Sequence, residues 1–273
     1  MGEADPRVLV ADQERVRTVT INVPAKRNAI DVVTRDELAQ VLAEAMDDPE
    51  VRALVLTGAG GTFSSGGDVS QMPRGKTAGE APGETGGEGA SGARARLEIM
   101  GTVVRHLVAG PKPVVAAVEG YAFGAGLSLV AACDHVVAAR NARFCCAFGR
   151  VGLLADAGAL WTLPQRVGLG AAKELLMFSD VIDAERAHAL GLVDHVTEPG
   201  DALRAAGERA ARLADAAPLP IAKTKEMLAR WPLTVDEVLD EEVSTQARLW
   251  ASADFAEGAA AFLERRAPRF EGK

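Results

Sequence analysis

The sequence predicts an α/β fold with a sheet buried on both faces, followed by a helical C-terminal region. Apolar runs of strand length alternate with amphipathic helical stretches through the first 200 residues, which is typical of α/β proteins. Runs such as 53–57 and 114–118 are apolar almost without interruption, which indicates strands covered on both faces. Beyond residue 200, the spacing of apolar residues is helical throughout.

The N-terminal elements begin with two strands, at 8–10 and 18–23, that are predicted to form a hairpin. The next helix has two possible starts: Asp31 as the N-cap, or a capping box of Thr34 and Glu37. The remaining alternating elements are expected as a strand at 53–57, a helix at about 94–109, a strand at 114–118, a helix ending near residue 133 and a strand at 135–139.

Two divisions of the chain are predicted, a core over 1–200 and a C-terminal helical subdomain over 201–273. The subdomain is expected to contain helices at 202–214, 221–229, 235–251 and 255–265. Residues 73–92 are rich in glycine and nearly free of large apolar groups, so they are predicted to form a flexible loop. Its position after a glycine-rich motif allows an active-site lid, and a tolerated surface insertion is the alternative.

Composition narrows the classes of function. The net charge of −8 argues against nucleic acid as a partner, because binding phosphates needs clustered Lys and Arg. No apolar run approaches the ~20 residues needed to span a membrane, and no signal peptide is expected. Cys133, Cys145 and Cys146 are expected to be reduced core residues of a cytoplasmic protein. No CxxC motif or Cys/His cluster suggests a metal site.

Two glycine-rich segments share one structural position, after an apolar strand and at the start of a helix. They are GAGGTFSSGGD at 58–68 and EGYAFGAG at 119–126. Glycine permits close approach of the backbone to a ligand, and the first turn of a helix presents unpaired N–H groups. Two such turns side by side would supply two donors to one developing oxyanion. Neither segment matches the phosphate-binding motifs of NTPases or of nicotinamide enzymes.

The segments TFSSGGDVSQM at 62–72 and EGYAFGAGLS at 119–128 resemble the two signatures of the enoyl-CoA hydratase/isomerase (crotonase) family. PAKRNA at 24–29, AHALGLV at 187–193 and AFLERRAPRF at 261–270 extend the resemblance over nearly the whole chain. The resemblance implies a spiral of ββα repeats with C-terminal helices, assembled as a homotrimer or hexamer. It also implies an acyl-CoA thioester substrate and no separate cofactor, since coenzyme A is part of that substrate.

The same resemblance assigns site residues. Gly67 and Ala125 would donate the two N–H groups of the oxyanion hole. The residues implied to contact coenzyme A are Lys26 near the phosphates, Ser64, Ser65 and Gly66 along the adenine end, Ala29 in the matching N-terminal motif, and Phe262 and Arg265, which a neighbouring subunit would contribute. Asp68 is expected to hold its loop through backbone hydrogen bonds.

The chain departs from the family's hydratases at the two positions where they carry catalytic glutamates, which here hold Ser128 and Phe148. Neither side chain is suited to general acid–base catalysis. Asp156 matches an aspartate that takes part in proton transfer in family isomerases, and its apolar surroundings are expected to raise its pKa. The alternative is that Asp156 only caps a helix that begins near Ala157.

Double-bond isomerisation through an oxyanion-stabilised enolate is therefore the leading hypothesis. Three alternatives remain: an enoyl-CoA hydratase with relocated acid/base groups, a dehalogenase or hydrolase that uses Asp156 as nucleophile, and a catalytically silent acyl-CoA-binding protein. The pattern FCCAF at 144–148 resembles 4-chlorobenzoyl-CoA dehalogenase, although His106 is out of register for its base. His135, His188 and His195 are interpreted as structural, since no motif gives them an acidic or nucleophilic partner.

Overall fold

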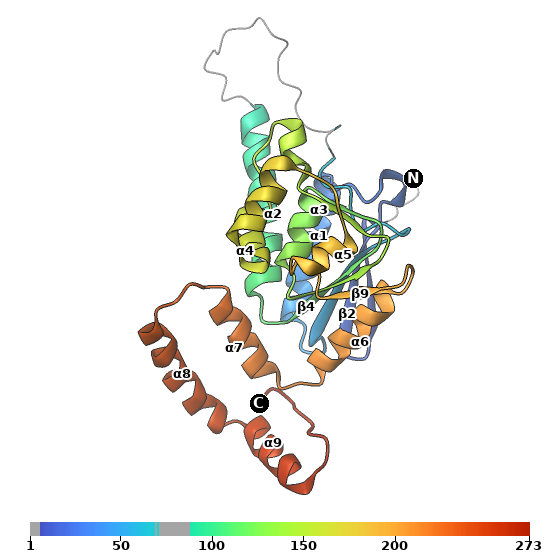
Figure 1. The fold of residues 1–273 in the computed structure, drawn as a ribbon. Coiled ribbons are helices and arrows are strands. Elements are labelled where there is room, and N and C mark those ends of the chain that lie inside the picture. Colours follow the sequence, from blue (N-terminus) through green and yellow to red (C-terminus); the bar gives the residue numbers. More distant parts are fainter. Residues whose placement is uncertain (1–5, 69, 71–87) are drawn as a thin grey trace, which may run out of the picture.

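A six-stranded sheet forms the centre of the structure, a computed structural model that describes residues 6–68, 70 and 88–273 (Figure 1). Its strand order is β1-β2-β3-β4-β6-β9, and only the β1–β2 pair is antiparallel. The strands are β1 (Val8–Gln13), β2 (Val16–Ile21), β3 (Ala53–Gly58), β4 (Val114–Val118), β6 (His135–Ala139) and β9 (His195–Thr197). All the predicted strands are thereby confirmed.

A second, three-stranded sheet consists of short strands that the sequence analysis did not predict. It contains β5 (Tyr121–Phe123), β7 (Arg143–Cys145) and β8 (Ile182–Asp183). Successive turns of the chain place one strand in each sheet and then form a helix, as in β4, β5 and α3 (Ala125–Ala132). The next turn is β6, β7, the 3-10 helix η3 (Ala147–Val151) and α4 (Ala159–Phe178). The expected spiral of ββα repeats is therefore confirmed.

Helices α1 (Val32–Asp47), α2 (Glu88–Ala109), α3 and α4 lie on one side of the large sheet (Figure 1). Leu42, Leu56, Val103, Leu129 and Leu163 meet in the fully buried core between them. Asp31 is the N-cap of α1, accepting from the Thr34 N–H at 2.8 Å. Glu37 instead accepts the N–H groups of Arg7 and Val8, so the alternative capping box is not formed.

Helix α2 begins at Glu88, so the loop predicted for 88–92 is wrong there. Extending an existing helix needs no new nucleus, which lets it run into a glycine-containing segment. An i,i+4 ion pair between Arg94 and Glu98 supports this end of the helix. Residues 73–87 of the predicted loop lie outside the described residues.

Helix α6 (Ala202–Ala214) covers the opposite face of the large sheet. Its small, fully buried alanines pack against Val55, Val115 and Val137. The first helix of the predicted C-terminal subdomain therefore packs on the core, and the division of the chain at residue 201 stays a prediction. The helical periodicity of the segment was correct, but periodicity does not reveal which surface a helix covers.

The separate C-terminal unit consists of α7 (Pro218–Leu228), α8 (Val235–Trp250) and α9 (Ala253–Glu264). Figure 1 shows α8 and α9 standing away from the sheet, with α7 nearer to it. Lys225 of α7 joins this C-terminal unit, called the arm below, to the core. Its ammonium lies 2.6 Å from Asp134 and donates to the Lys112 carbonyl at 2.9 Å. Arg52 donates to the Phe270 carbonyl at 2.7 Å, and this bond holds the C-terminal tail against the segment before β3.

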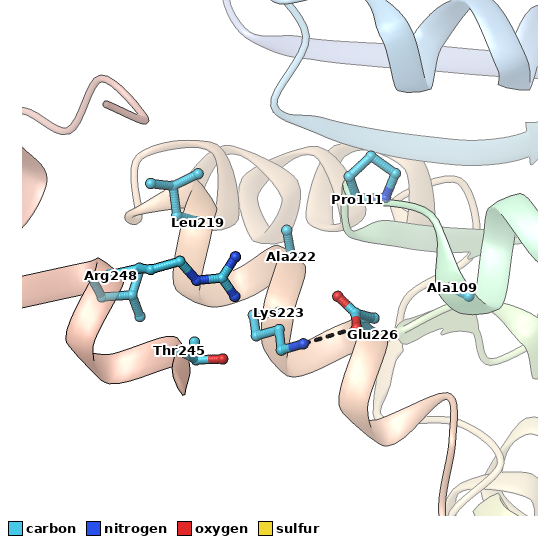
Figure 2. Close-up of a pocket in the computed structure, with 9 residues that line it drawn as sticks. Ala109, Pro111, Leu219, Ala222, Lys223, Glu226, Thr245 and Arg248 are labelled. Atoms are coloured by element: carbon cyan, nitrogen blue, oxygen red, sulfur yellow. Dashed lines mark hydrogen bonds and ion pairs between the residues drawn. The ribbon is translucent and has the colours of Figure 1, made fainter. Parts of the chain in front are cut away.

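A pocket lies between α7, α8 and the connection from α2 to β4 (Figure 2). On its α7 side, Lys223 forms an ion pair with Glu226 at 2.9 Å. The pocket contains none of the predicted site residues; it is lined by Ala109, Pro111, Leu219, Ala222, Lys223, Glu226, Thr245, Arg248 and Leu249. Among the described helices, none is long and apolar enough to cross a membrane.

Candidate functional site

The first glycine loop (residues 58–68) and the second glycine loop (residues 119–126) lie directly side by side. Ser64 is bound by its backbone to the second loop, donating to the Tyr121 carbonyl at 2.8 Å and accepting from the Phe123 N–H at 3.0 Å. Gly126 allows this contact, because a Cβ there would lie 2.8 Å from the Ser64 carbonyl oxygen. The predicted pairing of the two glycine turns is therefore present in the structure.

The close approach of the two glycine loops also explains why residue 66 is a glycine. Its φ is +96°, in the region that favours glycine, and a Cβ there would lie 2.8 Å from the Phe123 carbonyl oxygen. The same Cβ would lie 3.5 Å from the Ala125 nitrogen. The turn before Gly67 and the first residue of α3 are thus in contact.

The N–H groups of Gly67 and Ala125 have no protein acceptor among the residues that the structure describes. Ala125 is the first residue of α3, where N–H groups have no intrahelical partner. Gly67 follows Gly66, whose own N–H is taken by the Ser64 hydroxyl at 3.1 Å. Two unpaired donors from different elements therefore lie in adjacent loops.

Segment 23–30 forms the outer wall of the first glycine loop. Ile30 donates to the Gly66 carbonyl at 2.8 Å and accepts from the Asp68 N–H at 3.2 Å. The Ser65 N–H donates to the Arg27 carbonyl at 2.9 Å. Asn28 is fully buried within this wall. In the sequence, Asn28 is marked only by the matching motif at 24–29 and by its place between a turn and an apolar segment.

The residues predicted to contact coenzyme A have different environments. Ser65 is exposed, and its hydroxyl donates to the Lys26 carbonyl at 3.3 Å. Ser64 is a correction, because it is 0% exposed and its hydroxyl donates to the Asn28 carbonyl at 2.7 Å. Its side chain therefore organises the loop and does not reach a ligand. Ala29 is buried as well, with only 8% of its surface exposed.

Lys26 and Asp68 form an ion pair of 2.8 Å across the mouth of the first glycine loop. The Lys26 ammonium, followed by the Ser70 hydroxyl, lowers the pKa of Asp68 below its usual value. Asp68 also accepts the Ser70 N–H at 3.0 Å, so its predicted role as a local organiser is confirmed. The Lys26 side chain remains half-exposed, and its ion pair with Asp68 holds its ammonium beside the first glycine loop.

Phe262 and Arg265 do not join the glycine loops within one chain. They lie on and at the end of α9, which Figure 1 places at the opposite end of the molecule from the first glycine loop. Phe262 is 84% exposed, and Arg265 is exposed as well. Their contribution to a neighbouring subunit's site stays a prediction.

The positions expected to hold glutamates contain buried side chains. Ser128 is 0% exposed on α3, and its hydroxyl donates to the Gly124 carbonyl at 3.3 Å. Phe148 is 8% exposed on η3, which follows β7. The Gly124 N–H donates to the Cys145 carbonyl at 2.9 Å, and this bond places the start of η3 beside the second glycine loop.

Asp156 is a partly buried carboxyl without a partner. Its Oδ1 is buried and accepts no hydrogen bond from the described residues. Burial raises the pKa of Asp156 above its usual value. The N-cap of α4 is Gly158, with no side-chain capping bond, so the capping alternative for Asp156 is wrong. Only the backbone carbonyl of Asp156 contributes to this turn, accepting from the Ala159 N–H at 3.1 Å.

A family model described as enoyl-CoA hydratase/isomerase matches residues 11–273. The chain belongs to this family. It is 35% identical to 1,2-epoxyphenylacetyl-CoA isomerase of Escherichia coli over 96% of its length and 97% of that protein. It is 32% identical to short-chain-enoyl-CoA hydratase of Clostridium acetobutylicum over 95% of both chains. The structure resembles an enoyl-CoA hydratase from Polaromonas with a TM-score of 0.87 and 34% identity, covering 96% of this chain and 99% of that one.

Other acidic and basic residues of this hydratase/isomerase family member are engaged elsewhere. The Glu119 carboxylate accepts the N–H groups of Gly200 and Ala202 at 2.9 and 3.2 Å, so it holds the start of α6. His188 contacts the Val193 carbonyl at 2.8 Å. His135 does have an acidic neighbour, since its Nδ1 lies 3.5 Å from Asp194, and burial lowers its pKa.

Helix α2 presents Val104 to the segment that follows Asp156, because a Cβ at Gly158 would lie 2.9 Å from a Val104 methyl group. Residues two apart on a helix point roughly 200° away from each other. His106 therefore points away from Asp156, which removes support for the dehalogenase interpretation. Within the described ranges, no group of three or more His, Cys, Asp or Glu side chains is placed to hold a metal ion.

Proposed function

We propose that this family member is an acyl-CoA-processing enzyme that moves a carbon–carbon double bond. The thioester carbonyl oxygen would accept the N–H groups of Gly67 and Ala125. Both donors lack an acceptor within the described part of the chain, lie in adjacent loops and belong to elements fixed by hydrogen bonds on either side. Such preorganised donors are most effective where negative charge develops, as on the oxygen of an enolate.

The proposed reaction needs one group that moves a proton between two carbons. The Asp156 carboxylate removes a proton from the carbon next to the double bond, and the electron pair moves onto the thioester oxygen as an extended enolate. The protonated Asp156 then returns the proton at the other end of the conjugated system. No atom is gained or lost, so a single carboxyl group is sufficient.

The observation that carries this proposal is the state of Asp156. A partly buried carboxyl with an unpaired oxygen and a raised pKa is typical of a proton-transfer group and uncommon in a purely structural role. Ser128 and Phe148, at the positions of the expected glutamates, are buried and supply no second acid/base group. Water addition requires a second proton-transfer step, for which paired carboxylates are the usual solution.

Hydration is the second candidate, favoured by the hydratase names of relatives such as the one from Clostridium acetobutylicum. A panel of 2-enoyl-, 3-enoyl- and aryl-CoA thioesters, incubated in deuterated water, separates the two. Isomerisation moves the double bond without adding water, and hydration adds one water to the product. Loss of a ring halide would support the dehalogenase, and free acid a hydrolase. Tight binding without any product would support a silent acyl-CoA-binding protein and refute the proposal.

A further inference from the structure

Asn28 uses all its polar atoms, some to close the turn of segment 23–28 and the others to join this segment to the first glycine loop. Its side-chain amide donates to the carbonyls of Ala59 and Thr62 at 2.8 and 2.6 Å. Its side-chain oxygen accepts the Val23 N–H at 2.9 Å, and its own N–H donates to the Val23 carbonyl at 2.9 Å. Because Asn28 is 0% exposed, removing any of these partners would leave a buried polar group unpaired.

The same residue reaches the turn before Gly67 through Ser64. The Asn28 carbonyl accepts the Ser64 hydroxyl at 2.7 Å, and that hydroxyl accepts the Gly66 N–H at 3.1 Å. The Gly66 N–H is consumed by this bond and cannot serve a ligand. The next N–H along the chain, that of Gly67, has no acceptor among the residues with a described position.

The direction of the Gly67 N–H follows from its peptide unit. This unit is planar and trans, so its carbonyl, which belongs to Gly66, points opposite to its N–H. That carbonyl accepts the Ile30 N–H at 2.8 Å, and Ile30 lies two residues after Asn28. The position of Ile30 therefore sets where the Gly67 N–H points, and a donor at the carbonyl also strengthens the N–H by polarising the unit.

We propose that Asn28 is a positioning residue for the oxyanion hole, acting through Ile30 and Ser64 on the peptide unit that carries the Gly67 N–H. The inference rests on the proposed function. Asn meets all the local requirements. The backbone at residue 28 has a φ of +55°, which Asn tolerates better than most residues. The site needs two side-chain donors and one acceptor, whereas Asp lacks the donors and Gly lacks the side chain.

The test uses two substitutions and a probe that is not consumed. Asn28→Asp keeps the shape and the acceptor but loses both donors, and Ser64→Ala removes the link to Gly66. Butanoyl-CoA, isotope-labelled at its thioester carbonyl, has no double bond to move and reports carbonyl polarisation by its infrared stretching frequency. Coenzyme A without an acyl group serves as the second ligand, because it has no thioester carbonyl.

We expect wild-type protein to lower the carbonyl frequency of bound butanoyl-CoA, and both variants to lower it much less. Turnover should fall by about 10- to 100-fold, below the ~10²–10³ lost when an oxyanion donor is removed outright. Affinity for coenzyme A should not change. Thr57→Val is the matched control, because it also removes a buried hydroxyl, but one whose 2.9 Å bond to the Ala117 carbonyl joins β3 to β4 and not segment 23–28 to the first glycine loop.

The outcomes separate this inference from the proposed function. If a folded variant retains the full frequency shift, Asn28 and Ser64 are structural only, and the oxyanion hole itself stands. If wild-type protein binds butanoyl-CoA without shifting its carbonyl frequency, the oxyanion hole is refuted and the positioning role with it. Should Asn28→Asp fail to fold, Ser64→Ala decides the question, since it removes one hydroxyl and introduces no charge.

Discussion

Replacing Asp156 by Asn tests the proposed chemistry with the smallest change of shape. The substitution removes the proton-carrying carboxyl and keeps the size of the side chain. We expect turnover of the preferred enoyl-CoA to fall by about 10²–10⁴, the usual contribution of a general acid–base group. At ~1.4 kcal/mol for each factor of ten, this is a rise of about 3–5 kcal/mol in the activation barrier.

The structure also predicts what the same substitution does to stability. Asp156 caps no helix and its Oδ1 has no hydrogen bond from the described residues, so Asn removes no stabilising contact. Burial raises the pKa of Asp156 in the folded state above its value of 3.8. Wild-type stability from this group is therefore present below pH 3.8 and is lost as the pH rises through the folded-state pKa. At neutral pH, Asp156→Asn should be at least as stable as wild type.

The assay combines steady-state kinetics, acyl-CoA binding and urea denaturation at several pH values. In wild type, the acid limb of the kcat/KM profile should lie above the ordinary Asp range, because the base must be deprotonated. Asp183→Asn is the matched control, since Asp183 caps α5 (Ala184–Ala189) by accepting the Arg186 N–H at 2.8 Å, and Asn also caps. Full isomerase activity in Asp156→Asn would refute the proton-carrier role, and a clear loss of stability would refute the account of its environment.

Three further predictions concern the loops, the arm and assembly. Gly66→Ala should lower turnover and cost about 1–3 kcal/mol in unfolding free energy, because it combines a φ of +96° with a clash against the Phe123 carbonyl. Gly200→Ala, at a φ of +90° in open space, should cost stability alone. Lys225→Met should lower the free energy of unfolding, measured in urea, by ~3 kcal/mol, because it leaves Asp134 without its cation. The double variant with Asp134→Asn should recover part of this loss, and a double variant with no recovery would contradict the pairing. Light scattering at micromolar concentration should show a trimer or hexamer, because large apolar side chains on α8 and α9 are exposed, including Trp250 at 68%; a monomer would contradict this.

The sequence was sufficient for five of the six strands of the large sheet, because these strands carry their own signal, whereas the three-residue β9 was not predicted. Strands β3 and β4 are buried along nearly their whole length and are bounded by turn residues, so a local pattern identifies them. The strands of the small sheet contain only two or three residues and depend on partners far along the chain. Helix α6 was predicted to the residue, but the surface that it covers was not, because an alanine-rich face fits a sheet as well as another helix.

The residues of the candidate site also differ in whether they have a local signal in the sequence. The two glycine loops were found from the sequence because each is a local feature, a turn after a strand, and Asp156 was found through the resemblance of its segment to that of family isomerases. The role of Asn28 was not, because its two amide bonds reach carbonyls 31 and 34 residues away. Ser64 was misassigned to the ligand for a related reason, since its hydroxyl faces a segment 36 residues earlier in the chain. Residues that hold a site together over such distances acquire their meaning only from the fold, whereas a glycine turn after a strand keeps a local signature.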